Sequence, residues 1–455
     1  KTSLNQLIFK TGKNQLVVQA NIDGSAPSNA TLQAKAKDSD LSEFSVFIPA
    51  LAMLGKPSLS IDARTINNDF KTEINISSQQ SLITISGIVK NYASLLEGTS
   101  TDDLAYELGG NFENVNLSDL LPDNPTRVLL NMDAKISGIG ISKEKTVARA
   151  DILIFDSTVE NRDIDTLRVA ADYRNSGIAG EMHLISRAGT LDVDFKIDDV
   201  WDSRPYTLLM SGRNINVQSI LLDESFDSSL NVDISSKGAA PDLDNLAGEI
   251  SVRMDSSTVM DIPIDTLLFA GIFSTTDFQI ESLNFDNSIA SLNGRGNLSL
   301  NRDSDVLVNL AIKEVTPFAS LLSIDTLAVQ GNVSAHIQGT PDSLTLNGRL
   351  LASDFIFNAI SFDSLHSQFE AGLINKAWSV SGAAKIDSLD ANGTKVNTIQ
   401  LETLYKNERL ESLLDIEISE EINSNMQLIL QDFKAPQLHA PHLSIAVKGH
   451  EWRGE

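Results

Sequence analysis

The chain has 455 residues, with 61 Asp and Glu against 35 Lys and Arg, so its formal net charge is −26. Its apolar content of 42% can form a large core, which excludes a disordered acidic tail. Nucleic-acid binding is excluded because it depends on phosphate neutralisation by Lys and Arg. The same charge argues against docking on anionic lipid headgroups through a polybasic patch.

The chain lacks any long apolar segment. The longest stretches, such as Ile48–Leu54 and Leu267–Phe273, fall well short of the roughly 20 residues that span a bilayer, which predicts no transmembrane helix. No cysteine occurs, which excludes disulfides, thiolate metal sites and cysteine nucleophiles. The sequence opens with Lys1 and ends directly after a strand-like run. We therefore expect an internal piece of a longer protein, whose signal peptide or anchor lies upstream.

Helical periodicity is scarce and strand periodicity is frequent. The best helical stretch, Leu41–Leu54, is interrupted by Pro49, so only a few short helices are expected. Apolar and polar residues alternate along many runs, which predicts strands with one apolar and one solvated face. In chain order these runs include 191–197, 230–234, 250–254, 298–300, 306–312, 333–337, 344–346 and 414–418.

Two sequence landmarks recur with a period of about 100 residues. The first matches Asn114–Leu121 with Asn214–Leu221 and Glu314–Leu322, and its Leu-Leu ends predict short helices. The second is an Ile-Asp-Thr-Leu phrase that opens a strand, at Ile164–Leu167 and Ile264–Leu267, with a looser copy at 361–365. An extra copy of the phrase at 324–327 is out of step.

This period divides the chain into repeat units. A repeat of this length, with roughly eight short strands, suits a segment of a long antiparallel sheet whose apolar face continues from unit to unit. The first unit is divergent, and its landmark is expected at 40–44. The expected units are 1–104, 105–204, 205–304 and 305–404, with 405–455 as the start of a further, truncated unit.

The segment Val329–Leu350, in which a strand ending Gly-Thr-Pro precedes a strand with a Leu-x-Gly pattern, resembles the repeats of the AsmA-like family, which includes TamB. The segments Leu117–Leu121 and Phe318–Leu322 resemble the short Leu-x-x-Leu-Leu helices of that family. The resemblance implies an all-β, elongated array of antiparallel strands curled into an open, apolar groove, the β-taco architecture. It also implies a bacterial envelope protein in the periplasm, tethered to the inner membrane by an N-terminal anchor and similar to eukaryotic bridge-like lipid transfer proteins.

No motif predicts catalysis, a metal or a cofactor. The pair His439 and His442 lacks further ligands at zinc spacing, so a solvated loop is favoured. The glycine-rich Gly294–Asn297 is expected to be a hairpin turn rather than a phosphate loop, because no helix pattern follows it. Adjacent acidic residues such as Asp198 and Asp199 would point to opposite faces of a strand or into solvent. We therefore predict that the protein is not an enzyme.

The apolar stripe is the feature with functional weight. We expect it to bind phospholipid acyl chains. Together with the stripe, the family resemblance implies that phospholipids are carried between the inner and outer membranes, which supports outer-membrane integrity. It also implies that the membrane contacts lie in parts of the protein outside this chain. Two alternatives remain: an assembly factor for outer-membrane β-barrel proteins acting through sheet edges, and a structural surface array whose stripe is closed and dry. The predicted groove-lining residues are Leu191, Val193, Phe195, Ile197, Leu298, Leu300, Val333, Ile337, Leu344, Leu346, Phe355 and Phe357.

Overall fold

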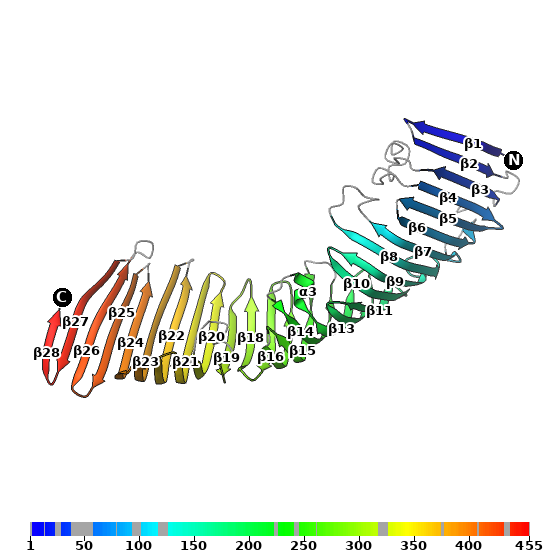
Figure 1. Cartoon of the computed structure of the whole chain (residues 1–455). Helices are drawn as coiled ribbons and strands as arrows, with labels where there is room; N and C mark the ends of the chain where they lie inside the picture. The colour runs from blue at the N-terminus through cyan, green and yellow to red at the C-terminus, as the bar shows by residue number, and fades with distance from the viewer. Residues whose placement is uncertain are drawn as a thin grey trace. The chain divides into compact units, whose positions relative to one another are not determined.

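The computed structural model is nearly all β, and its strands β1–β28 belong to one antiparallel sheet that does not close (Figure 1). The α-helix bounded within the described residues is the short α3. The described residues are 2–12, 14–22, 29–37, 58–78, 80–92, 102–116, 126–222, 226–240, 245–260, 262–316, 326–374, 377–406, 409–431 and 437–454.

The chain divides into two compact units. Unit 1 comprises Lys1–Leu243 and Thr258–Asp261, and unit 2 comprises Asp244–Ser257 and Ile262–Glu455. The elements of unit 1 are β1 Thr2–Thr11, β2 Asn14–Ile22, β3 Ala30–Ala36, β4 Ser58–Ile66, β5 Asp69–Ser78, β6 Ser81–Lys90, β7 Ala105–Asn116, β8 Val128–Ile139, β9 Val147–Val159, β10 Arg162–Arg174, β11 Gly177–Ser186, β12 Gly189–Ile197, β13 Pro205–Ile215, α3 Val217–Leu221 and β14 Ser228–Ala239.

Unit 2 is built in the same way, from strands of 5–15 residues. Its elements are β15 Ala247–Val259, whose last two residues belong to unit 1, β16 Ile262–Phe273, β17 Asp277–Asp286, β18 Ala290–Ser299, β19 Ser304–Ile312, β20 Leu327–Thr340, β21 Ser343–Phe357, β22 Ile360–Ile374, β23 Ala377–Ala391, β24 Thr394–Lys406, β25 Arg409–Ser419, β26 Ile422–Gln431, β27 Gln437–Val447 and β28 His450–Gly454.

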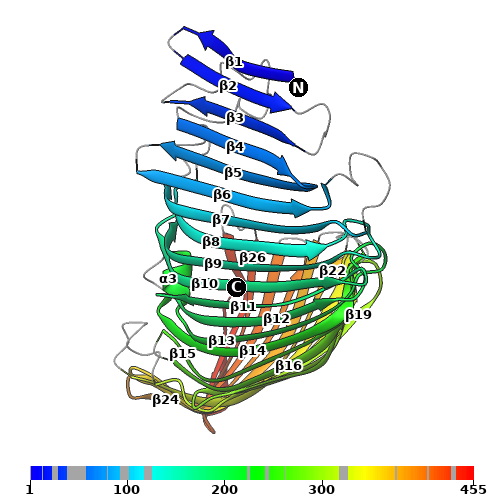
Figure 2. The ribbon, with the colours of Figure 1, turned by 90° about the vertical axis from the view of Figure 1, so that its right-hand side faces the viewer.

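Each strand pairs antiparallel with its neighbours in the sequence, so both units extend by simple addition. In unit 1 the pairing is continuous from β1 to β14, as the side-by-side strands of Figure 2 show. In unit 2 it is continuous from β16 to β28. Among the described strands, β1 pairs only with β2 and β28 only with β27, so neither unit forms a barrel.

The register of unit 1 gathers apolar side chains on one face. Directly paired residues of an antiparallel sheet point to the same side, so one row can be followed through every strand. The row through Val193 contains only apolar residues and glycine. From β1 to β14 it reads Leu7, Val18, Ala34, Ile61, Ile74, Ile85, Gly110, Ala134, Ile152, Val169, Met182, Val193, Met210 and Ile234. We call this side the apolar face of unit 1 and the opposite side its charged face.

Unit 2 has the same two-sided character. The row through Leu346 runs over β16 to β26 without a charged residue, and it defines the apolar face of unit 2. It reads Gly271, Ile280, Gly296, Val306, Ile337, Leu346, Ala371, Val380, Tyr405, Leu410 and Leu430. The opposite side is the charged face of unit 2.

The sequence period corresponds to six strands. Ile164–Leu167 lies near the start of β10 and Ile264–Leu267 near the start of β16, and the looser copy at 361–365 lies near the start of β22. The expected strand-opening role of the phrase is therefore confirmed. Residues 105–204 hold six described strands rather than about eight, because each strand runs over 9–13 residues. The repeat-unit boundaries stay a prediction.

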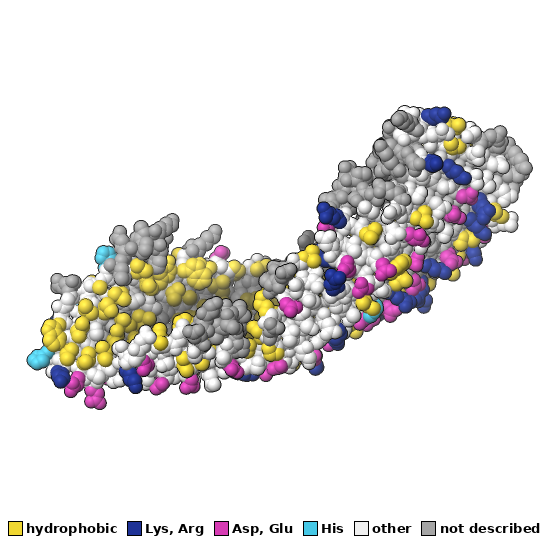
Figure 3. Space-filling view, viewed as in Figure 1, with side chains coloured by type: hydrophobic (Ala, Val, Ile, Leu, Met, Phe, Trp, Pro, Cys, Tyr) yellow, Lys and Arg dark blue, Asp and Glu magenta, His cyan; other side chains and the backbone are white. Residues whose placement is uncertain are grey.

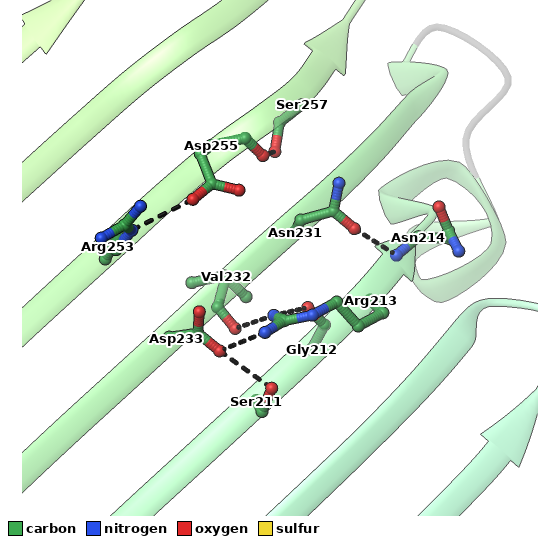
Figure 4. Close-up of polar contacts among 10 residues, drawn as sticks. All are labelled: Ser211, Gly212, Arg213, Asn214, Asn231, Val232, Asp233, Arg253, Asp255 and Ser257. Carbon is green, nitrogen blue, oxygen red and sulfur yellow. Dashed lines mark hydrogen bonds and ion pairs between the residues drawn. The ribbon is translucent and has the colours of Figure 1, made fainter.

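The first landmark coincides with a β-bulge. Asn114 in β7 and Asn214 in β13 have positive φ angles of 48° and 52°, and the register shifts at both places. Each backbone N–H donates to an asparagine Oδ1 of the next strand: Asn114 to Asn131 at 2.7 Å, and Asn214 to Asn231 at 3.1 Å (Figure 4). Asparagine tolerates this left-handed conformation well, which gives a physical reason for the recurrence of asparagine after 100 residues.

The predicted landmark helix is confirmed at one position. α3 begins after Asn216, whose side chain accepts a hydrogen bond from the Ser219 N–H, the usual contact of an N-cap residue. The predicted helices at 117–121 and 318–322, the helical stretch 41–54 and the first-unit landmark at 40–44 lie outside the described residues.

The expectation of a hairpin turn at Gly294–Asn297 is wrong. These residues lie inside β18, where Gly294 pairs with Leu283 and Val308, and Gly296 pairs with Ile280 and Val306. Gly296 has a φ of 144°, which an L side chain rarely adopts, so glycine is required there by the strand itself.

Ser157 links β9 to β8 beside another bulge, at Asp156 (φ 42°), where the register between these two strands shifts. The side chain is only 2% exposed, and its Oγ accepts a hydrogen bond from the Asn131 N–H at 2.8 Å and donates to the Phe155 carbonyl at 2.8 Å. The Asn131 side chain supports the same bulge, because its Nδ2 donates to the Asp156 carbonyl at 2.8 Å. The Ser157 hydroxyl is the buried part of this hydrogen-bonded arrangement.

We predict that Ser157→Ala weakens this part of unit 1 by about 1–3 kcal/mol, because a buried N–H loses its partner. Amide hydrogen exchange is the suitable measurement, because a repeat array need not unfold in one step. Exchange in β8 and β9 should accelerate roughly tenfold to a hundredfold. Ser86→Ala, at an exposed position, is the control; equal exchange in the two variants would contradict the prediction.

Candidate functional site

The chain exposes far more surface than a globular protein of its size. Its accessible surface is 27356 Å² for 49.3 kDa, whereas a compact monomer of this mass exposes about 16800 Å². The buried apolar residues are accordingly few, and they include Ala34, Leu59, Ile83 and Val115. Packing within the sheet therefore leaves much apolar surface in contact with solvent.

Part of that exposed surface belongs to the apolar faces. On the apolar face of unit 1, Leu4, Leu7, Leu108 and Ile136 are all more than a third exposed. The described part of the chain places no second sheet over this face, so the alternation does not produce the dry interior of a sandwich. Contiguous apolar surface of this extent is the usual sign of a binding surface.

In unit 2 the apolar side chains line a hollow. The space-filling view shows hydrophobic side chains gathered in a recess over the C-terminal strands, with acidic and basic side chains along its lower rim (Figure 3). We call this recess the unit 2 groove. Its floor is the apolar face that the row through Leu346 defines.

Four predicted groove-lining residues lie in unit 1. Leu191, Val193, Phe195 and Ile197 alternate along β12 and pair with Leu184, Met182, Gly180 and Ile178 of β11, all on the apolar face. Val193 is only 7% exposed and the other three are partly buried.

The structure places five of the unit 2 residues on one face. Leu298, Val333, Ile337, Leu344 and Leu346 all belong to rows of the apolar face of unit 2. Leu298 is 42% exposed, which leaves it accessible to a ligand.

Three other predicted residues differ. Leu300 lies in a bend after β18 and is 70% exposed, so it does not belong to the floor of the groove. The alternation is interrupted before Phe355 and Phe357 by the positive φ of Asp354, where the register with β20 shifts. Phe355 stacks on Phe362 with ring centroids 4.4 Å apart, whereas Phe357 is 38% exposed. Alternation cannot assign the facing of residues beyond a bulge.

The prediction also missed the apolar face of the N-terminal strands. Ile61, Ile74 and Ile85 continue the unit 1 row through β4, β5 and β6, and Ile76 and Ile83 continue a neighbouring row. The signal was present in the sequence, since these isoleucines alternate with polar residues as clearly as those of β12 do. These strands belong to the divergent first repeat, in which the match to the later repeats is weakest.

The charged faces carry ion pairs between neighbouring strands and along strands. In unit 1, Lys135 Nζ lies 2.8 Å from Glu107 Oε1, and Arg213 Nη2 lies 2.7 Å from Asp233 Oδ1, which also accepts from the Ser211 hydroxyl (Figure 4). All the charged groups of these two pairs are more than a third exposed, so each pair contributes at most about 1 kcal/mol. Their main effect is to keep this side of the sheet solvated.

Both charged faces are hollowed as well. A recess of about 1040 Å³ lies over β4–β10 of unit 1, and one of about 800 Å³ lies over β19–β26 of unit 2. Basic residues such as Arg64 and Arg168 alternate with acidic ones such as Asp62 and Asp133 in the first recess. Neither anions nor cations are favoured by such a mixture.

The described residues offer no group of three or more His, Cys, Asp or Glu side chains arranged to hold a metal ion. None of the described helices is long and apolar enough to cross a bilayer. The sequence matches no protein-family model, and comparison with curated proteins gives no significant match. The candidate site is therefore defined by the two apolar faces themselves.

One charged-face carboxylate has a strongly shifted pKa. Hydrogen bonds from the side chains of Arg302 and Ser299 lower the pKa of Asp277 from 3.8 to about 2, with Arg302 Nη2 at 2.7 Å from Oδ2. Since the pKa in the folded state is depressed, the ionised carboxylate stabilises unit 2 above about pH 4. This contribution is lost as the pH falls from about 4 to about 2.

We predict that Arg302→Gln returns the pKa of Asp277 toward 3.8 and reduces the loss of thermal stability between pH 4 and pH 2. The pKa can be measured by NMR titration of the carboxyl carbon. Arg295→Gln removes a positive charge from β18 without touching Asp277 and should leave the pKa unchanged. An unaltered Asp277 pKa in the Arg302 variant would contradict the assignment.

Proposed function

We propose that this protein binds phospholipids through its apolar faces and carries them between two membranes without chemical conversion. The observation that carries the proposal is the unbroken row of apolar residues through β1–β14, on a face that no second sheet covers in the described chain. A corresponding face runs through β16–β26 of unit 2.

The energetics favour acyl chains as the ligand. Shielding one CH₂ group from water contributes about 0.8 kcal/mol, so a 16-carbon chain gains roughly 12 kcal/mol before the cost of ordering is subtracted. A polar headgroup can remain in solvent, because an open sheet does not enclose the ligand. Binding then requires no headgroup-specific side chain, only a continuous apolar surface.

Continuity distinguishes transport from simple binding. Adjacent apolar positions in a row are related by strand pairing, so no charged residue interrupts the path of an acyl chain along either row. A lipid can move from one strand to the next while its tail stays shielded. We infer a passive conduit, whose direction and energy source come from elsewhere.

The cellular setting follows from the same proposal. The sequence resemblance to the AsmA-like family supports a periplasmic location, a tether to the inner membrane and a role in outer-membrane integrity. In this setting the two ends of the conduit contact the inner and outer membranes through other parts of the protein. An outer-membrane barrel protein at the far end is a partner that fits this arrangement.

The first test is the lipid content of the chain purified without detergent. Native mass spectrometry with lipid extraction should find more than one phospholipid per chain. A chain free of lipid would overturn the proposal, and a copurifying barrel-assembly protein in place of lipid would favour the assembly-factor alternative.

The second test uses two adjacent residues on opposite faces. We predict that Leu346→Asp lowers phospholipid occupancy of the unit 2 groove about tenfold or more, because a carboxylate on the apolar floor must be desolvated by a bound acyl chain. Occupancy can be measured by photo-crosslinking with an acyl-diazirine phosphatidylcholine and peptide mapping.

Asn347→Asp is the matched control. It adds the same charge one residue further along β21, on the charged face, where Asn347 pairs with His336 and Glu370. Its lipid labelling should equal that of the unmodified chain. If both variants or neither lost labelling, the assignment of faces would be wrong.

A further inference from the structure

Several glycines on the apolar faces lie beneath a bulky side chain of a neighbouring strand. A Cβ atom on Gly180 would lie 2.7 Å from Phe195 Cζ, one on Gly87 would lie 2.6 Å from Leu108 Cδ2, and one on Gly138 would lie 2.5 Å from Tyr106 Oη. Each glycine is directly paired with the residue that covers it. The bulky side chain is therefore folded flat against the backbone of the next strand.

Glycines of the charged faces are not covered in this way. A Cβ atom on Gly109 would meet nothing closer than Ser86 Oγ at 3.6 Å, and one on Gly372 would meet only Ser379 Oγ at 3.2 Å. Among the glycines compared, contact with a large side chain of the next strand therefore occurs on the apolar side of the sheet and not on the charged side. Such a pairing restores the apolar cover that a strand glycine lacks.

Phe369 in β22 is the clearest case, because it has glycine on both sides. Its cross-strand partners are Gly348 in β21 and Gly382 in β23. A Cβ atom on Gly348 would lie 2.1 Å from Cζ and 2.6 Å from both Cε atoms, so the tip of the ring lies directly over this glycine. The three atoms nearest to that position all belong to the Phe369 ring.

The second glycine is open toward the ring. A Cβ atom on Gly382 would lie 3.5 Å from Phe369 Cβ and 3.3 Å from the Gln368 carbonyl, with no ring atom among its nearest neighbours. The ring thus has two places against the sheet, one occupied over Gly348 and one vacant over Gly382. Any other position raises the ring away from the sheet into the groove.

We propose that Gly348 and Gly382 form a recess that stores the Phe369 ring, and that this recess keeps the unit 2 groove deep enough to admit acyl chains. The inference rests on the proposed lipid-binding function and deepens it, because it assigns groove depth to particular glycines. Phe369 is then a positioning residue that either provides a flat floor or obstructs the groove.

The test is the double variant Gly348→Ala with Gly382→Ala. Two methyl groups occupy both places of the ring, so the ring must stand up from the floor. The probe is a phosphatidylcholine with a diazirine at the end of one acyl chain, delivered to the full chain from phosphatidylcholine vesicles. The added methyl groups overfill the site, so the Phe369 ring is displaced into the groove. Because the displaced ring takes the place of an acyl chain, labelling of β20–β24 should fall about fivefold or more. Labelling of unit 1 should be unchanged.

Three further variants make the result decisive. Adding Phe369→Ala to the double variant should restore labelling of β20–β24, which a merely unfolded sheet would not do. Gly372 lies in β22, as Phe369 does, but on the charged face, so Gly372→Ala should label as the unmodified chain does. Phe369→Ala alone adds no atoms and should label at least as well as the unmodified chain.

The two proposals fail in different ways. An unmodified chain that shows no labelling in either unit overturns the lipid-binding function itself. A labelled unmodified chain whose double variant labels equally, or is not restored by Phe369→Ala, overturns the recess alone. If the double variant does not fold, a loss of labelling in folded Phe369→Ala overturns the recess and normal or increased labelling supports it.

Discussion

The structure depends on one constraint: an antiparallel sheet must send alternate side chains to opposite sides. Within each unit, one side receives the apolar residues in strand after strand, through β1–β14 and through β16–β26. An ordinary domain would satisfy that side by packing a second layer against it. In the described parts of this chain the register is kept across many strands while no second sheet is supplied. The uncovered face follows from the register, and the proposed function follows from the uncovered face.

The charged face is the counterpart of this arrangement. Its exposed ion pairs add little stability, but they keep one side solvated and thereby make a one-residue register slip costly. A one-residue slip would turn Lys135 and Asp194 to the apolar face of unit 1. In the native register both lie on the charged face, where Lys135 forms an exposed ion pair with Glu107. The charges therefore specify the pairing more than they strengthen it.

The sequence predicted the alternation, the strand class and the 100-residue period, because each is written in local residue patterns such as Leu191–Ile197 and Ile164–Leu167. The predictions were wrong where the backbone conformation differs from the one that the local residue pattern indicates. Gly294–Asn297 contains the residues of a turn, yet their cross-strand partners make them part of a strand. Phe355 and Phe357 keep the period of two, yet a bulge at Asp354 breaks the relation between period and face.

Other features could not be deduced before the pairing was known. The contact of Phe369 with Gly348 joins residues 21 apart in the sequence, and nothing in either local sequence marks it. The bulges at Asn114 and Asn214 are different, because the sequence repeat already marks both positions. The left-handed backbone conformation of these asparagines could be learned only from the structure. Repetition thus showed where the sequence is constrained, and the structure supplied the physical reason.

Pairing between chain neighbours has a consequence for how such a protein reaches its folded state. Ala30 and Thr65, which pair between β3 and β4, are 35 residues apart in the sequence. This is among the longer separations between directly paired residues in the described sheet, and most paired residues lie closer together along the chain. Folding that relies on such local contacts is comparatively fast and has no need of the distant end of the chain. Strands can therefore be added one after another as the polypeptide emerges from a ribosome or a translocation pore, each new hairpin using the previous strand as its template.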